Sequence, residues 1–111
     1  MRDHRRLKVF DMAHRLVLHV YTATEKFPSK EQFGLTSQIR RSAVSVPSNV
    51  VEGCARGQGD YKRFLSIAYG SSAELEYQLE LSKDLGYLDQ PELHEEARAL
   101  SCALKALVQS V

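Results

Sequence analysis

Four apolar stripes at helical spacing constrain the fold of this chain more than any other feature. In each stripe, apolar or small residues recur every three or four positions, and no segment sustains the alternation typical of a half-buried strand. The stripes cover residues 9–27, 35–54, 61–86 and 93–111. Helices with such seams pack nearly parallel or antiparallel to one another. The sequence therefore predicts an all-α protein.

Short breaks separate the stripes. We expect Asp60 to cap the third helix, Gly86 to end it and Asp89 to cap the fourth. Because short connections make consecutive helices antiparallel neighbours, the prediction is an up-down-up-down antiparallel four-helix bundle. At 111 residues the chain, 1–111, is expected to form a single domain, with helices over about residues 7–26, 35–57, 60–86 and 90–110.

Two residues depart from good helix-forming sequence. Pro47 lies inside the second helix, where proline removes a backbone donor and costs roughly 3 kcal/mol. Since neighbouring serines and Asn49 can bond the freed backbone groups, we expect a continuous helix kinked at Pro47, rather than one that ends and restarts. Gly70 begins a run of small residues in the third helix, which predicts close approach of the second helix there.

The sequence offers no site for chemistry. It contains no nucleophile motif, phosphate loop or paired metal-ligand spacing, and Asp11 and His14 stand alone at the spacing of a di-metal bundle motif. We therefore expect no catalytic residue, no metal and no cofactor. No apolar run is long enough to span a membrane. Cys54 and Cys102 are expected to be reduced core residues, which suits a cytoplasmic protein without membrane contact.

Positive charge is concentrated in the first part of the chain. Residues 1–66 hold 12 Lys or Arg against 6 Asp or Glu, whereas residues 67–111 hold 3 against 8. Arginine suits phosphate because it is always charged and binds in a bidentate manner. The residues that are candidates for binding nucleic acid are Arg5, Arg6, Lys8, Arg40, Arg41, Arg56, Lys62 and Arg63. Two alternatives stay open: the charges only solvate two faces, or Arg40 and Arg41 make structural ion pairs.

Several apolar residues lie beside the stripes. In a monomeric bundle they would form exposed patches, which usually mark interfaces, so we expect a homo-oligomer. The candidate interface residues are Met12, Leu18, Tyr21, Tyr69, Tyr77 and Leu81. A ring of subunits would join the modest basic patches into an extended surface that binds phosphates with little sequence preference.

Two long runs carry a family resemblance. They are FGLTSQIRRSAVSVPSNVVEGCARG at residues 33–57 and YKRFLSIAYGSSAELE at residues 61–76. Both closely resemble the four-helix-bundle proteins encoded within intervening sequences of bacterial 23S ribosomal RNA genes. The likeness spans nearly the whole chain. One departure is Phe10, where many members have tryptophan.

The resemblance implies a non-enzymatic, ring-forming and typically pentameric bundle. A similar family, the accessory variability determinant of diversity-generating retroelements, associates with a reverse transcriptase and binds nucleic acid. Two partners are therefore implied besides the chain itself: RNA or DNA, or alternatively a reverse transcriptase or other protein docked without nucleic-acid contact. The positions that match the quoted motifs, besides Arg40, Arg41 and Arg56, are Pro47, Asn49, Glu52, Gly53 and Gly70.

Overall fold

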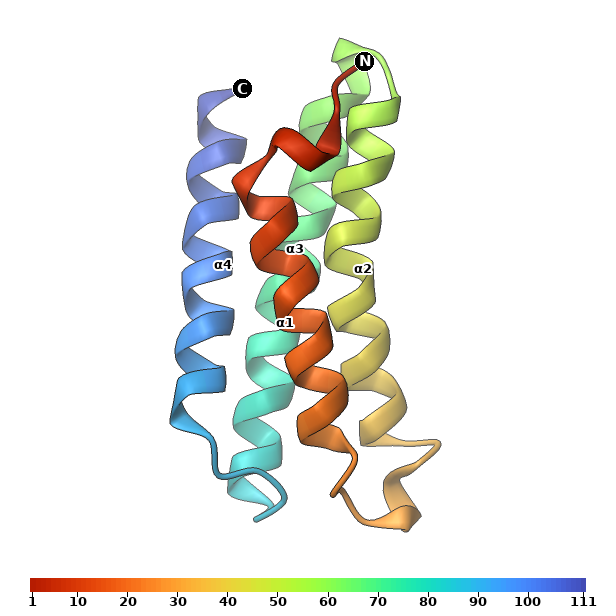
Figure 1. The fold of residues 1–111 in the computed structure, drawn as a ribbon, viewed down its shortest axis with the longest axis vertical. Coiled ribbons are helices and arrows are strands. Elements are labelled where there is room, and N and C mark those ends of the chain that lie inside the picture. The colour runs from red at the N-terminus through yellow and green to blue at the C-terminus, as the bar shows by residue number, and fades with distance from the viewer.

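The computed structural model describes all 111 residues and is an up-down-up-down four-helix bundle (Figure 1). It contains no strand, so the predicted all-α bundle is confirmed. Helices α1 and α3 each pack against both α2 and α4. None of the helices combines the length and the apolarity needed to cross a lipid bilayer. The elements are η1 (His4–Arg6), α1 (Lys8–Thr24), η2 (Ser29–Glu31), α2 (Leu35–Ala55), α3 (Gln58–Asp84) and α4 (Pro91–Ser110).

The core follows the four stripes. Its largest fully buried side chains come from all four helices and include Leu16, Ile39, Leu65, Leu79 and Leu100. The stripe of α2 is buried along its whole length, whereas α4 leaves the core at its end. Within this frame, packing of the apolar seams fixes the rotation of each helix and decides which polar residues face outward.

Helix α2 continues through Pro47, as expected. The side chain of Asn49 donates from Nδ2 to the Ser45 carbonyl oxygen at 2.8 Å and to the Ser45 Oγ at 3.0 Å. Proline removes the N–H that would bond the Ala43 carbonyl, and the Asn49 bonds go instead to Ser45, two residues later. They therefore brace the adjacent turn and do not replace the lost backbone bond.

Both ends of α3 and the start of α4 can be compared with the caps that the sequence predicts. The left-handed Gly86, with φ of +82°, ends α3: its N–H bonds the Lys83 carbonyl, and the Tyr87 N–H bonds the Ser82 carbonyl, which is a Schellman motif. The predicted cap at Asp60 is wrong because α3 begins two residues earlier, behind Gly57. The predicted cap at Asp89 is also wrong, since Gln90 precedes α4 without a capping side chain.

The bundle has two chemically different ends, which lie far apart along its 43 Å axis. The chain's two termini and the α2–α3 turn lie together at the top in Figure 1. The α1–α2 connection and the α3–α4 turn lie at the other end. There the Tyr87 hydroxyl donates to Glu31 at 3.1 Å, and the other carboxylate oxygen of Glu31 accepts from the Leu35 N–H at 3.1 Å. This link fixes the connection that precedes α2.

Close approach between α2 and α3 occurs at Gly53 and not at Gly70. A Cβ on Gly53 would lie 3.0 Å from the Phe64 Cβ and 3.3 Å from the Tyr61 carbonyl oxygen, whereas a Cβ on Gly70 would meet nothing within 4 Å. The prediction is wrong for Gly70 itself, which lies on the exposed side of α3. It is confirmed for the next residue of the same run, because Ser71 and Ser45 of α2 share a 2.8 Å hydrogen bond.

Alanine at the two glycines is expected to change stability in opposite directions. Gly53→Ala forces Phe64 away from its packed position and should lower the free energy of unfolding by about 1–3 kcal/mol. Gly70→Ala removes an unfavourable helix-interior glycine without a clash and should raise it by up to about 1 kcal/mol. Urea denaturation of both variants measures the difference. A Gly53→Ala protein as stable as the Gly70→Ala protein would contradict the described packing.

Candidate nucleic-acid interface

The N-terminal segment is fixed onto the α2–α3 turn. The Arg2 N–H donates to the Cys54 carbonyl oxygen at 2.8 Å, and the Arg2 guanidinium donates to the Gln58 Oε1 at 2.7 Å. The same guanidinium lies 3.7 Å from the centroid of the Tyr61 ring, a cation–π contact. Sequence reasoning did not find this attachment, which brings the basic residues of η1 next to those that begin α3.

Most of the positive charge gathers at this end. We define the basic end as residues 1–8, 52–66 and 104–111, which hold eight Lys or Arg against three Asp or Glu. The acidic end comprises residues 25–38 and 76–96, which hold three Lys or Arg against nine Asp or Glu. The charge asymmetry of the sequence thus becomes an asymmetry along the bundle axis. Such a distribution attracts a polyanion to one end and repels it from the other.

Some cations at the basic end have partners within the chain. Arg5 bonds Asp3 at 3.2 Å. The backbone N–H of Arg5 and then its side chain lower the pKa of the Asp3 carboxyl below its ordinary value. Arg56 pairs with Glu52 at 2.9 Å and with Asp60 at 3.5 Å. These exposed pairs leave the arginines near the surface but partly neutralised.

Other cations at this end make no ion pair. Arg6, Lys8 and Lys62 are exposed and have no acidic partner within 4 Å. Arg63 is also exposed, and its guanidinium lies 4.8 Å from the centroid of the Phe64 ring. These residues keep their donors free for a phosphate ligand. Geometrically they are the most accessible of the eight candidates.

Arg40 and Arg41 are neighbours in sequence but differ in environment. The half-buried Arg40 donates to the Thr24 Oγ1 at 2.8 Å and to the Tyr21 carbonyl oxygen at 3.2 Å, so it satisfies the carboxyl end of α1. Neither arginine makes an ion pair within the chain. Arg41 is exposed and lines a polar groove between α2 and α3. Of the two, only Arg41 is exposed and makes no hydrogen bond to another residue of the chain.

The chain is similar to known proteins in both sequence and fold. The model of the family described as 23S rRNA-intervening sequence protein matches residues 5–109. The chain belongs to this family of 23S rRNA-intervening sequence proteins. The resemblance noted in the two runs of sequence is thereby confirmed.

One solved structure supports the fold of this family member. A protein with unknown function from the S23 ribosomal protein family of Bacteroides thetaiotaomicron VPI-5482 is 21% identical to the chain, with a TM-score of 0.81. The match covers 91% of this chain and 95% of that protein. At this identity the likeness shows a shared bundle fold. A search of the curated proteins finds no match.

The structure shows what surrounds each residue that matches the family motif. Pro47 and Asn49 lie in the interrupted turn of α2, Glu52 pairs with Arg56, and Gly53 permits the approach of α3. Gly70 alone faces open space. Four of these five positions therefore lie in the second half of helix α2.

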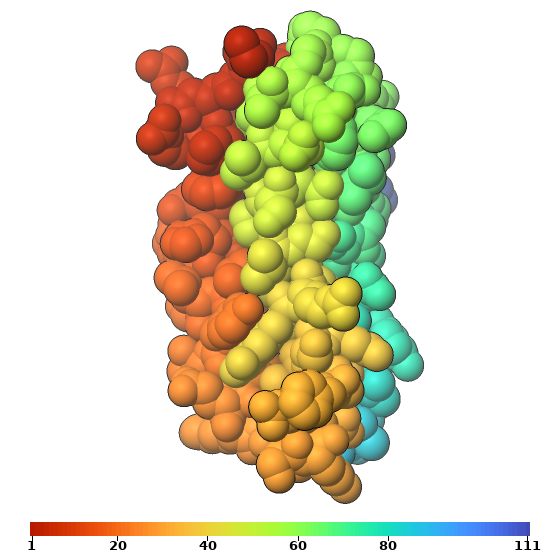
Figure 2. Space-filling model, turned by 90° about the vertical axis from the view of Figure 1, so that its right-hand side faces the viewer, coloured from red at the N-terminus to blue at the C-terminus, as the bar shows by residue number.

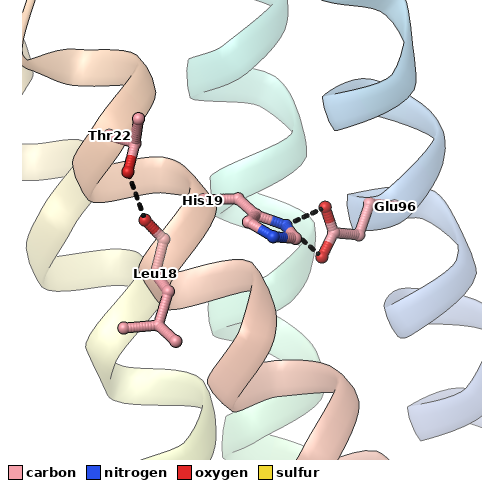
Figure 3. A network of polar contacts seen from close by, with 4 residues as sticks. All are labelled: Leu18, His19, Thr22 and Glu96. Carbon is pink, nitrogen blue, oxygen red and sulfur yellow. Dashed lines mark hydrogen bonds and ion pairs between the residues drawn. The ribbon is translucent and has the colours of Figure 1, made fainter.

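The apolar residues beside the stripes divide into two groups. Met12, Tyr69 and Leu81 are half-buried and pack against the core. By contrast, Leu18 and Tyr77 are exposed by 54% and 62%, and Tyr21 by 41%. Figure 3 shows that Leu18 points away from the contact between α1 and α4, where the His19 Nδ1 lies 2.7 Å from a carboxylate oxygen of Glu96. The surplus apolar surface is thus smaller than the sequence indicates, but it is real.

The two cysteines also differ. Cys54 is buried, and burial raises the pKa of its thiol. Cys102 is exposed on α4, so the expectation that both cysteines are core residues is wrong for Cys102. It is the residue after the buried Ser101, and one position along a helix turns the side chain by about 100°.

Proposed function

We propose that this chain is a non-enzymatic, cytoplasmic homo-oligomer that binds RNA or DNA through its basic end. The observation that carries the proposal is the excess of eight cations over three anions there, with several cations free of internal partners. Contacts of this kind bind phosphates and read little sequence. The basic end offers no row of exposed aromatic rings on which single-stranded bases would stack.

Self-association supports the same proposal. We infer a ring, with five subunits as the resemblance implies, because exposed Leu18, Tyr21 and Tyr77 require cover. Subunits that point the same way would place their basic ends side by side. A ring thus multiplies a patch that is modest on one subunit into a surface that contacts many phosphates.

The test is binding of an RNA hairpin and a DNA duplex, measured by fluorescence anisotropy across a salt series. The four unpaired cations, Arg6, Lys8, Lys62 and Arg63, predict a slope of log affinity against log salt of about −3 to −4 for each subunit in contact. Light scattering on the same samples reports the oligomer. An intact oligomer that binds neither ligand at low salt would reject the proposal.

A second candidate function is docking of a protein partner, for example a reverse transcriptase, without nucleic-acid contact. A cleft of about 580 Å³ between α3 and α4 favours it. The cleft lies at the acidic end, and exposed Tyr77, several carboxylates and the unpartnered, buried Nε2 of His94 line it. A basic partner segment matches this lining. Glu80→Lys with Asp84→Lys should weaken such docking and leave nucleic-acid binding intact.

A further inference from the structure

A polar groove lies between α2 and α3. It has a volume of about 260 Å³, and α2, which forms one side of it, runs along the face shown in Figure 2. No apolar side chain lines it. Its lining residues are Gln38, Arg41, Ser42, Ser45, Ser71, Glu74 and Gln78. A polar, surface-accessible hollow in an otherwise apolar helix seam requires an explanation beyond packing.

Gln78 gives the groove a buried, unused acceptor. In the sequence, Gln78 stands between the core residues Leu75 and Leu79, and its side chain is only 5% exposed. It lines the groove, and its Oε1 has no hydrogen-bond partner. Leaving a buried acceptor unpaired costs about 1–3 kcal/mol. The oxygen itself has almost no exposed surface, so a ligand in the groove recovers that free energy only when the amide group turns its oxygen toward the ligand.

Charged groups of both signs flank this acceptor. Arg41 comes from α2 and Glu74 from α3, and neither makes an ion pair or a hydrogen bond within the chain. The guanidinium suits a phosphate, to which it can donate two parallel N–H bonds. The Glu74 carboxylate and the Gln78 Oε1 accept bonds, and the paired hydroxyls of Ser45 and Ser71 can join either set.

We propose that this groove binds the ribose phosphate unit of RNA or of a free ribonucleotide. Arg41 holds the phosphate, while Glu74 and the Gln78 Oε1 accept hydrogen bonds from ribose hydroxyls. A carboxylate on a ribose hydroxyl is a recurrent mode of nucleotide recognition. The volume lies just below the roughly 300 Å³ at which sites for drug-sized ligands begin, as a sugar phosphate requires.

Two other ligands fit this groove less well. An inorganic phosphate alone would satisfy Arg41 but would offer no ribose hydroxyls to Glu74 and Gln78. A nucleobase would find neither an aromatic nor an apolar surface on which to stack. For RNA, the proposal rests on the proposed function. It adds that the 2′-hydroxyl lets this chain prefer RNA to DNA.

The first experiment uses free nucleotides, so it does not depend on polynucleotide binding. Titration calorimetry compares adenosine 5′-monophosphate, its 2′-deoxy analogue and inorganic phosphate. We expect the ribonucleotide to bind about tenfold more tightly than the deoxy form, the worth of one hydrogen bond to a charged acceptor. Two variants each alter one acceptor. Gln78→Met keeps the side-chain volume at a buried position, and Glu74→Gln is an exposed change that still tests the proposal if Gln78→Met does not fold. Loss of either acceptor should weaken the preference, whereas Lys30→Gln, an exposed change at the acidic end, should keep it.

The second experiment compares one sequence as single-stranded RNA and as DNA. We expect RNA to bind more tightly, and Gln78→Met or Glu74→Gln to bring the two affinities closer together without changing the salt slope. Nucleotide preference without polynucleotide binding would support the groove and reject the basic-end function. Equal binding of RNA and DNA, with no preference between the two nucleotides, would overturn the groove and leave that function standing. If no ligand binds, both proposals are overturned.

Discussion

Reversal of three cations at the basic end is expected to weaken nucleic-acid binding by roughly 100-fold or more near 100 mM salt. The variant replaces Arg6, Lys62 and Arg63 by glutamate. Each of these residues is exposed and none makes an ion pair, so the only internal contact that the change breaks is the cation–π contact of Arg63 with Phe64. The salt slope should become shallower by about two to three units per subunit in contact. Anisotropy across the salt series measures both quantities.

The acidic end supplies the matched control. Lys26, Lys30 and Lys83 are exposed and lie at the opposite end of the bundle, so their replacement by glutamate changes the net charge by the same amount. This control should lower the affinity only slightly, through the long-range field that salt screens. Equal losses in the two triple variants would mean that net charge, and not the basic end, governs binding. Circular dichroism should show unchanged helix content in both.

The bundle was predictable because its signal is repeated and cooperative. Four seams of apolar residues each exclude a strand, and together they leave few ways to bury the chain. Continuity of α2 through Pro47 was also predictable, since Asn49 and the serines lie within one turn of it. The helix caps were predicted less well. Asp60 is a good capping residue, but α3 already begins at Gln58 without any capping side chain. Periodicity fixes which helices form better than it fixes where they begin.

The candidate site depended on rotation and register, which the sequence does not state. Arg40 and Arg41 look equivalent as a basic pair, yet about 100° of helix rotation sends one to the end of α1 and the other to the α2–α3 groove. Gly53 and Gly70 likewise look alike, and only the register of α3 against α2 shows which one is needed.

Gln78 did leave a signal that sequence reasoning missed. It lies one turn from Leu75 and next to Leu79, so it is a polar residue at the edge of the buried stripe. A buried amide is costly without partners, and such a position can be found by asking what satisfies it. The attachment of Arg2 left no comparable signal, because it depends on how the first residues fold back over the α2–α3 turn.

Glutamate at Leu18 is expected to dissociate the proposed oligomer. Leu18 and Tyr21 on α1 lie beside α2, since Arg40 bonds the Tyr21 carbonyl and lies 4.5 Å from the centroid of its ring. Because α1 and α2 are antiparallel, we infer that Leu18, one turn before Tyr21, lies level with the 38% exposed Val44, one turn after Arg40. Burying an unpaired carboxylate there costs about 3 kcal/mol or more, which raises the dissociation constant at least about 100-fold.

Leu85 provides the comparison for this variant. It is 49% exposed, close to the exposure of Leu18, but it lies in the α3–α4 turn at the acidic end. Light scattering at micromolar concentration should report an oligomer for the wild type and for Leu85→Glu, and a single subunit for Leu18→Glu. Because Leu18 contributes nothing to the core, the monomeric variant should keep its helix content. Loss of nucleic-acid affinity together with the oligomer would show that the basic ends act jointly, whereas unchanged affinity would assign binding to one subunit.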